Sequence, residues 1–162
     1  MSNKARRNLK LQHPADAAWT TVVFDTCLQR AHQIEDTILT ACREHHFADH
    51  DIFALKLALE EALVNAVKHG NQNDPCKKVT VQYRVNDARV DVSIEDQGPG
   101  FNPAELPDPT SAEHLEDSHG RGILLMRAYM NNVVYSPNGT RVTLTKFNEG
   151  AHETTAHRLA LG

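Results

Sequence analysis

The stretch from Asp49 to Gly70 constrains the fold of this chain more than any other, because its residue spacing predicts a long helix. Asp49 is a natural N-cap, and Gly70 suits the left-handed position that often follows a helix. Glu61 and Asn65 are four residues apart and therefore share a face, and His69 continues the same line. Apolar residues recur at intervals of three and four, as on the buried face of an amphipathic helix. These residues are Ile52, Leu55, Leu59, Ala62, Leu63 and Ala66.

Downstream of this helix the period of the sequence changes from helical to alternating. Residues 79–85 and 90–94 alternate apolar with polar side chains on either side of Asn86-Asp87, which predicts an antiparallel hairpin with a two-residue turn. Residues 132–136 and 140–147 flank a Pro-Asn-Gly sequence and predict a second hairpin. Two hairpins behind a core helix indicate an α/β fold.

The remaining segments suggest one domain with two tails. The β-branched segment Thr20–Asp25 predicts a short edge strand, and Leu28–His45 has the apolar spacing of a helix. Residues 102–119 hold three prolines, many acids and no apolar period, which predicts a mobile loop of the kind that often serves as a lid. A length of 162 residues suits a single domain. The expected boundaries are 1–18 for a flexible arm, 19–147 for the domain and 148–162 for a tail.

Charge and hydropathy argue against several classes of protein. The formal net charge is −4 and the pI is near 6.2, so a broad basic surface for nucleic acid or for an anionic membrane is not expected. No apolar run is long enough to span a bilayer, and the N-terminus lacks the apolar segment of a signal peptide. We therefore expect a cytoplasmic protein that binds neither nucleic acid nor membrane.

Cysteine and histidine spacing gives little support to a metal site. Cys27, Cys42 and Cys76 are far apart, without the paired spacing of a zinc or redox motif. Histidines cluster just before the central helix, at positions 45, 46 and 50, and a metal site there is conceivable. Because no further ligand accompanies them at suitable spacing, a hydrated connection between two helices is the preferred interpretation.

Polar and glycine-rich motifs follow one another along the chain. They are Glu61-x-x-x-Asn65, Asp96-x-Gly98-x-Gly100 and Gly120-x-Gly122. Each motif alone is weak, since glycines also serve simple turns. Together they suit a nucleotide: glycines let backbone approach a ligand, and N–H groups at a helix start attract phosphate. The amide oxygen of Asn65 suits Mg²⁺, and the carboxylate of Asp96 can accept a hydrogen bond from an exocyclic amine. The set predicts an adenine-nucleotide site that is neither a P-loop nor a Rossmann fingerprint.

With these motifs, the chain resembles the GHKL ATPase superfamily and, within it, the small bacterial anti-sigma factors that are also serine kinases. The resemblance runs from about Trp19 to Phe147, through EEALVNAVKHGN, IEDQGPGF, HGRGILLM and GTRVTL. It implies a two-layer α/β sandwich of the Bergerat type, in which a mixed, mostly antiparallel sheet is covered on one face by helices. ATP would lie under a lid between the asparagine-bearing helix and the glycine motifs.

The resemblance also implies roles for the matching residues. Glu61 would be the general base, Asn65 would ligate Mg²⁺ and Asp96 would read the adenine amine. Glu60 is the other candidate base, but it points about 100° away from the face of Asn65. Such kinases often carry an Arg ahead of the second glycine motif, where this chain has Ser118-His119. The further nucleotide-binding candidates are His69, Gly98, Gly100, Phe101, Gly120, Arg121, Gly122 and Thr140.

Three functions are compatible with this resemblance. The first is an ATP-dependent serine/threonine protein kinase that phosphorylates a small antagonist protein and sequesters a sigma factor, as a homodimer formed through residues 20–25 and the first helix. The second is a non-catalytic, nucleotide-gated protein-binding regulator of the same fold. The third, a histidine-kinase catalytic domain, would need a dimerisation helix pair with a phosphoacceptor His, and we expect too little chain upstream for that.

Overall fold

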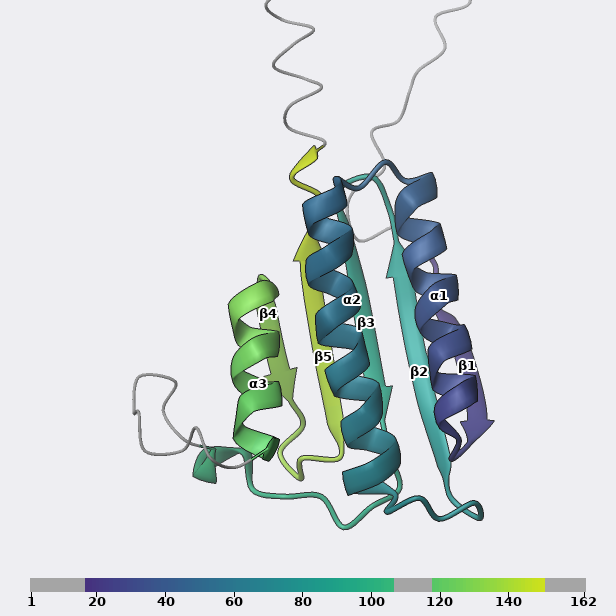
Figure 1. Ribbon diagram of the computed structural model, residues 1–162, viewed down its shortest axis with the longest axis vertical. Coiled ribbons are helices and arrows are strands. Elements are labelled where there is room, and N and C mark those ends of the chain that lie inside the picture. Colours follow the sequence, from purple (N-terminus) through teal and green to yellow (C-terminus); the bar gives the residue numbers. More distant parts are fainter. Residues whose placement is uncertain (1–16, 107–117, 151–162) are drawn as a thin grey trace, which may run out of the picture.

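The structure, a computed structural model, describes residues 17–106 and 118–150 (Figure 1). Three predicted segments therefore lie mostly outside the described residues: the arm at 1–18, the lid at 102–119 and the tail at 148–162. Within the described ranges, no helix is both long enough and apolar enough to cross a membrane.

One antiparallel sheet runs through the described part of the chain, with its strands in the order β1-β2-β3-β5-β4 (Figure 1). All pairings between these strands are antiparallel, so a mixed sheet was the wrong expectation for the described residues. Short turns join β2 to β3 and β4 to β5, and a short turn can join only antiparallel neighbours. β1 lies at an edge, as predicted. The strands are β1 (Thr20–Asp25), β2 (Lys78–Val85), β3 (Arg89–Glu95), β4 (Asn132–Tyr135) and β5 (Arg141–Phe147).

The helices α1, α2 and α3 cover one face of this sheet (Figure 1). The predicted apolar stripe of α2 is buried throughout, and Leu55 and Leu59 are completely inaccessible. Alternate residues of the central strands, such as Val81 and Val92, meet that stripe from the sheet. The helical elements are α1 (Leu28–Glu44), α2 (Asp49–Val64), a π-helical turn η1 (Asn65–Gly70), a short 3₁₀ turn η2 (Pro103–Glu105) and α3 (Ser118–Tyr129).

Both ends of the central helix differ from the prediction. Ala48, not Asp49, is the N-cap: its carbonyl accepts the first helical hydrogen bonds, and Asp49 lies in the first turn. At the other end Gly70 does not take a left-handed conformation, and the positive φ angles fall on Gln72 and Asn73 instead, both at 56°. The local C-cap rule therefore does not explain the glycine at position 70.

The first hairpin turn is also shifted, by one residue. The N–H of Asn86 donates to the carbonyl of Arg89, so Asp87 and Ala88 form the turn rather than Asn86 and Asp87. The side-chain oxygen of Asn86 accepts from the N–H groups of Ala88 and Arg89, each at 2.9 Å. An Asn side chain that caps its own turn explains the shift.

Ordered packing continues past the expected end of the domain at residue 147. Asn148 is buried, and its amide donates to the carbonyls of His45 and Asp87. The segment after β5 thus ties the α1–α2 connection to the β2–β3 turn. The cysteines are unpaired: Cys42 is buried in the core, Cys27 is partly buried and Cys76 is exposed.

Candidate functional site

A cavity of about 450 Å³ opens at the end of α2 where the helix passes into η1. It lies between this helix end, the loop after β3, the start of α3 and the β4–β5 hairpin. Of the residues singled out in the sequence, Asn65, His69, Asp96, Gly100, Phe101 and Gly120 line it. Its apolar wall, which sequence reasoning did not identify, is formed by Ala62, Ala66, Ile94, Leu106, Ile123, Tyr135 and Val142.

Two acidic residues line this cavity, Asp96 just after β3 and Glu105 in η2, and Asp96 is the one that the sequence motifs singled out. Its Oδ1 accepts from the N–H of Gly98 at 2.8 Å, and its own N–H donates to the carbonyl of Thr140 at 3.0 Å. Burial raises the pKa of the Asp96 carboxyl, and the neighbouring Glu95 adds to this, while the Gly98 hydrogen bond and Lys77 oppose it. Asp96 therefore offers a partly desolvated acceptor aimed at a pocket.

Close backbone approach to Asp96 explains two of the glycines. A Cβ atom at Gly70 would lie 2.6 Å from Oδ1 of Asp96, and one at Gly98 would overlap the carbonyl of Gly70. A side chain at position 70 would displace the Asp96 carboxylate, and one at position 98 would displace the backbone of Gly70. The glycine at the helix end is thus required by Asp96, not by the helix terminus.

Asn71 holds the Asp96 loop in place, and sequence reasoning missed it. Its buried side chain accepts from the N–H of Gln97 at 2.7 Å and donates to the hydroxyl of Thr26 and to the carbonyl of Lys78, each at 2.9 Å. One amide therefore joins the helix end, the β1–α1 turn, the start of β2 and the loop after β3. In the sequence it is one of several polar residues in a loop, which gave no signal of burial.

Glu61 and Asn65 meet at the beginning of α3, as their shared face predicted. A Cβ atom at Gly122 would lie 2.5 Å from Oε2 of Glu61 and 3.7 Å from Nδ2 of Asn65. The glycine thus lets α3 approach both side chains. Glu60 is exposed on another face of the helix. The pKa of the Glu35 carboxyl on α1 is raised mainly by the burial of Glu35 and also by the negative charge of Glu60. The two neighbouring acids are therefore separated as predicted.

The loop after β3 and the β4–β5 turn pack against each other through positive-φ glycines. Gly100 and Gly139 both have φ of 71°, and the Phe101 N–H donates to the carbonyl of Asn138 at 3.0 Å. The Phe101 ring packs edge-on against Tyr135, with 5.3 Å between ring centroids. Burial raises the pKa of Tyr135 to about 12, so its hydroxyl stays protonated. An aromatic wall therefore stands opposite the polar helix end.

The predicted residues that do not line the cavity are Glu61, Gly98, Arg121, Gly122 and Thr140. Thr140 is tied to the Asp96 loop by its carbonyl, while its hydroxyl donates to Oδ1 of Asn138 at 3.0 Å. Arg121 is exposed in the first turns of α3. α3 begins at Ser118, two residues earlier than the glycine motif predicted, so Gly120 and Gly122 lie inside the helix.

The residues present fit a purine nucleotide with a metal ion. Apolar and aromatic side chains line one wall, the partly buried carboxylate of Asp96 lies among the polar residues, and glycines remove the side chains that would fill the space. Asn65 provides an oxygen of the hard type that suits Mg²⁺.

The fold and cavity together define an α/β sandwich with a ligand pocket between its helix layer and one end of its sheet. Residues 25–146 match the model of the histidine kinase-like ATPase domain, and the chain belongs to this family. The resemblance identified from the motifs is thereby confirmed, and membership of an ATPase family implies the use of ATP.

Curated relatives are about one third identical to this chain over the aligned residues. The serine-protein kinase RsbW of Bacillus licheniformis is 36% identical over 104 residues, which cover 60% of this chain and 65% of that protein. RsbW of Bacillus subtilis is 31% identical over 115 residues, 65% of this chain and 72% of that one. The anti-sigma F factor of Oceanobacillus iheyensis is 31% identical over 102 residues, 59% and 69% respectively. The chain thus spans about two thirds of the length of these relatives.

A solved structure of the RsbU and RsbW domains of a Mycobacterium tuberculosis protein is also similar, with a TM-score of 0.48 and 15% identity. The match covers 81% of this chain and 31% of that one.

Proposed function

We propose that this chain is an ATP-dependent protein-serine/threonine kinase and anti-sigma factor, which phosphorylates a small antagonist protein and sequesters a sigma factor. The observation that carries the proposal is the joint position of Glu61 and Asn65 against Gly122, beside a cavity that Asp96 lines. Relatives named serine-protein kinase and anti-sigma F factor support both parts of it. A mere packing role does not require an acid and an amide at this place.

In this proposal Asp96 selects adenine over guanine. Adenine presents an exocyclic amine to an acceptor, whereas guanine presents a carbonyl at the same position, so the ionised carboxylate favours ATP over GTP. Calorimetric titration should show a much lower affinity for GTP, and Asp96→Ala should lower ATP affinity by up to roughly a hundredfold, which is the about 1–3 kcal/mol of an unpaired polar group. Equal affinities for the two nucleotides would contradict the adenine assignment.

Glu61 supplies the base for phosphoryl transfer. Its carboxylate takes the proton of the substrate serine, the serine oxygen bonds to the γ-phosphorus, and the bond from that phosphorus to the β–γ bridging oxygen breaks to release ADP. Asn65 would hold Mg²⁺, which when bound supplies positive charge to the β- and γ-phosphates. His69, Gly100, Phe101 and Gly120 would border the nucleotide, with Arg121 and Thr140 at its margins.

The proposed partners are the antagonist protein, a sigma factor and a second copy of this chain. For the second copy we propose the exposed edge strand β1 together with α1, in a cytoplasmic protein. An edge strand with free backbone groups is a ready pairing surface.

The experiment that tests this function is incubation with labelled ATP and the candidate antagonist encoded nearby. Label on a serine or threonine of the antagonist supports the kinase. If no antagonist is ever labelled, yet a partner binds in an ATP-dependent way, the alternative of a non-catalytic, nucleotide-gated regulator replaces it.

A further inference from the structure

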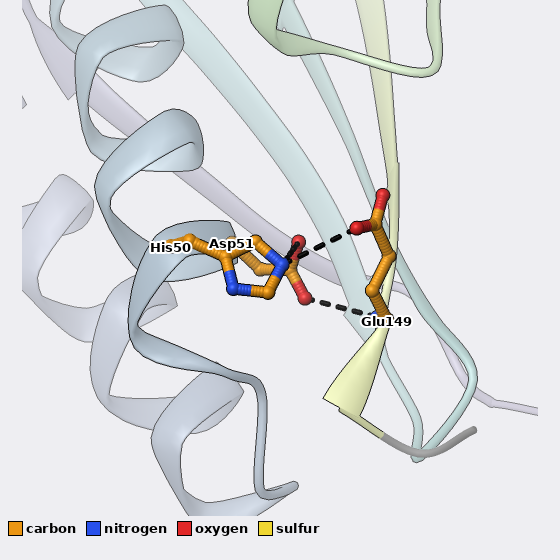
Figure 2. Close-up of side chains that lie close together, drawn as sticks. All are labelled: His50, Asp51 and Glu149. Atoms are coloured by element: carbon orange, nitrogen blue, oxygen red, sulfur yellow. Dashed lines mark hydrogen bonds and ion pairs between the residues drawn. The ribbon is translucent and has the colours of Figure 1, made fainter. Parts of the chain in front are cut away.

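A second polar cluster lies at the opposite end of α2 from the nucleotide cavity, where the first turn of that helix meets the segment after β5 (Figure 1). His50 and Asp51 come from the helix and Glu149 from the segment, and their side chains point toward one another (Figure 2). The proposed kinase reaction uses none of the three.

The spacing of these side chains matches that of metal ligands. Nε2 of His50 lies 3.3 Å from Oδ1 of Asp51 and 3.2 Å from Oε2 of Glu149. All three ligand atoms lie within 4.8 Å of one another. Around a tetrahedral Zn²⁺, with bonds of about 2.0–2.1 Å, ligand atoms are about 3.3 Å apart. The cluster therefore already has two of the edges of a zinc tetrahedron.

Asp51 is the observation that separates this cluster from an ordinary surface group. It is completely buried, and its Oδ2 is fixed by the N–H of Glu149 at 2.9 Å. Its Oδ1 faces His50 but accepts no hydrogen bond from the described residues. The ammonium of Lys146 balances the charge of this oxygen from 3.2 Å, but no described donor makes a hydrogen bond to it, and one N–H of His50 cannot point at both carboxylates.

Lys146 supplies the positive charge when no metal is bound. Its ammonium lies 3.2 Å from Oδ1 of Asp51 and 3.5 Å from Oε1 of Glu149, and its side chain is nearly buried. A dication between the same carboxylates would compete with this ammonium. The metal and the lysine are therefore alternative partners of Asp51 and Glu149. Removal of the lysine charge should strengthen metal binding, which would not be expected of a simple ion-pair cluster.

We propose that His50, Asp51 and Glu149 bind a divalent transition metal of the Zn²⁺ type, with water in the fourth position. An imidazole beside two carboxylates suits Zn²⁺, whereas Mg²⁺ and Ca²⁺ prefer oxygen ligands alone. The metal would pin the start of α2 to the chain after β5, far from the transferred phosphoryl group. Its role is structural, and it is separate from the Mg²⁺ proposed at Asn65.

The test is calorimetric titration of the full chain with ZnCl₂ in the absence of nucleotide. We expect the original chain to bind Zn²⁺ and His50→Ala to lose this site. The fall in zinc affinity should exceed the about 10–100-fold loss that follows from removing an outer-shell partner of a metal ligand. His32→Ala is the matched control, because His32 is an exposed helical histidine that also lies near a buried acid, Glu35. It should leave this site unchanged.

Lys146→Met gives a result of the opposite sign. The methionine keeps the buried aliphatic stem and removes the competing ammonium, so Zn²⁺ should bind more tightly and raise the melting temperature more than in the original chain. His50 is exposed, so His50→Ala should fold and decides the question even if Lys146→Met does not fold. Zinc affinity unchanged in His50→Ala, or no zinc binding by the original chain, would overturn the proposal.

Discussion

Asp96 is placed where its charge is costly without a ligand. Burial raises the pKa of this carboxyl, so the folded chain holds the proton more tightly than the unfolded chain does. The ionised form therefore reduces stability once the pH exceeds the ordinary pKa of an aspartate. An adenine amine that donates to the carboxylate would recover part of that cost, which couples the ionisation of Asp96 to nucleotide binding.

The first prediction concerns the pH dependence of this coupling. ATP affinity should fall as the pH is lowered through the raised pKa of Asp96, at a higher pH than an ordinary aspartate would give, because the protonated acid is a poorer acceptor. Calorimetric titrations over a series of decreasing pH values, continued below the ordinary pKa of an aspartate, measure it. Asp96→Asn keeps an acceptor oxygen and does not titrate, so its affinity should lack this step. A step of the same size in the variant would assign it to another group.

The second prediction separates the two acids of the central helix. Glu61→Gln should keep ATP affinity nearly intact while lowering phosphoryl transfer by roughly 10²–10⁴-fold, because only the proton acceptor is removed. Glu60→Gln is the matched control, since Glu60 is exposed on another face, and it should retain activity. Asn65→Ala should instead lose metal-dependent nucleotide binding. Equal activity of the two glutamine variants would remove Glu61 from the mechanism.

At the scale of elements, the cavity depends on loops held by a buried amide rather than on helix packing alone. Asn71 follows η1 and contacts the β1–α1 turn, the start of β2 and the loop after β3. Asn71→Ala should lower the free energy of unfolding by about 1–3 kcal/mol, since buried partners lose their hydrogen bonds. Urea unfolding measures this loss. The control is Asn132→Ala, because Asn132 in β4 is exposed. ATP affinity should fall with Asn71→Ala as well, because Gln97 is adjacent to Asp96.

Local patterns predicted the elements well where one periodic face decides the structure. The three- and four-residue spacing around Leu55 and Leu59 gave the core helix, and the alternation around Val81 and Val92 gave the hairpin. A glycine at position 70 was predicted to suit a left-handed helix end, and this reason was wrong. A side chain is excluded there by the carboxylate of Asp96, which lies just after β3. A rule about helix ends does not include contacts from a distant segment.

The same limit applies to the candidate site. The motifs predicted a shared site for Glu61, Asn65 and Asp96. In the structure Glu61 and Asn65 both face Gly122, and Asn65 and Asp96 both line the cavity. Asn71 and Tyr135 were given no role, because their contacts with the site depend on how separate turns pack. Asn71 ends the EEALVNAVKHGN motif, but the motif alone did not indicate that its side chain is buried. The roles of all these residues remain predictions that the variants above test.

For the whole molecule, the buried hydrogen bonds of Asn148 predict that the segment after β5 adds to the stability of the domain. A chain ending after Phe147 should be less stable than one ending after Gly150 by about 1–3 kcal/mol, because it loses the buried hydrogen bonds of Asn148. Thermal unfolding of the two truncated chains measures the difference. Equal melting temperatures would support the earlier boundary. Because Glu149 is also removed, the comparison should be made with chelator present, so that no metal contributes.

The buried position of Cys42 allows the rate of global opening to be measured from the rate at which its thiol is alkylated. Its thiol is fully buried, and burial raises its pKa to about 12, so alkylating reagents cannot attack it while the core is closed. Cys76 is exposed and reacts from the folded state. In a time course followed by mass spectrometry of the separate cysteine peptides, modification of Cys76 therefore reports reagent access at the surface, and the slower modification of Cys42 reports how often the core opens.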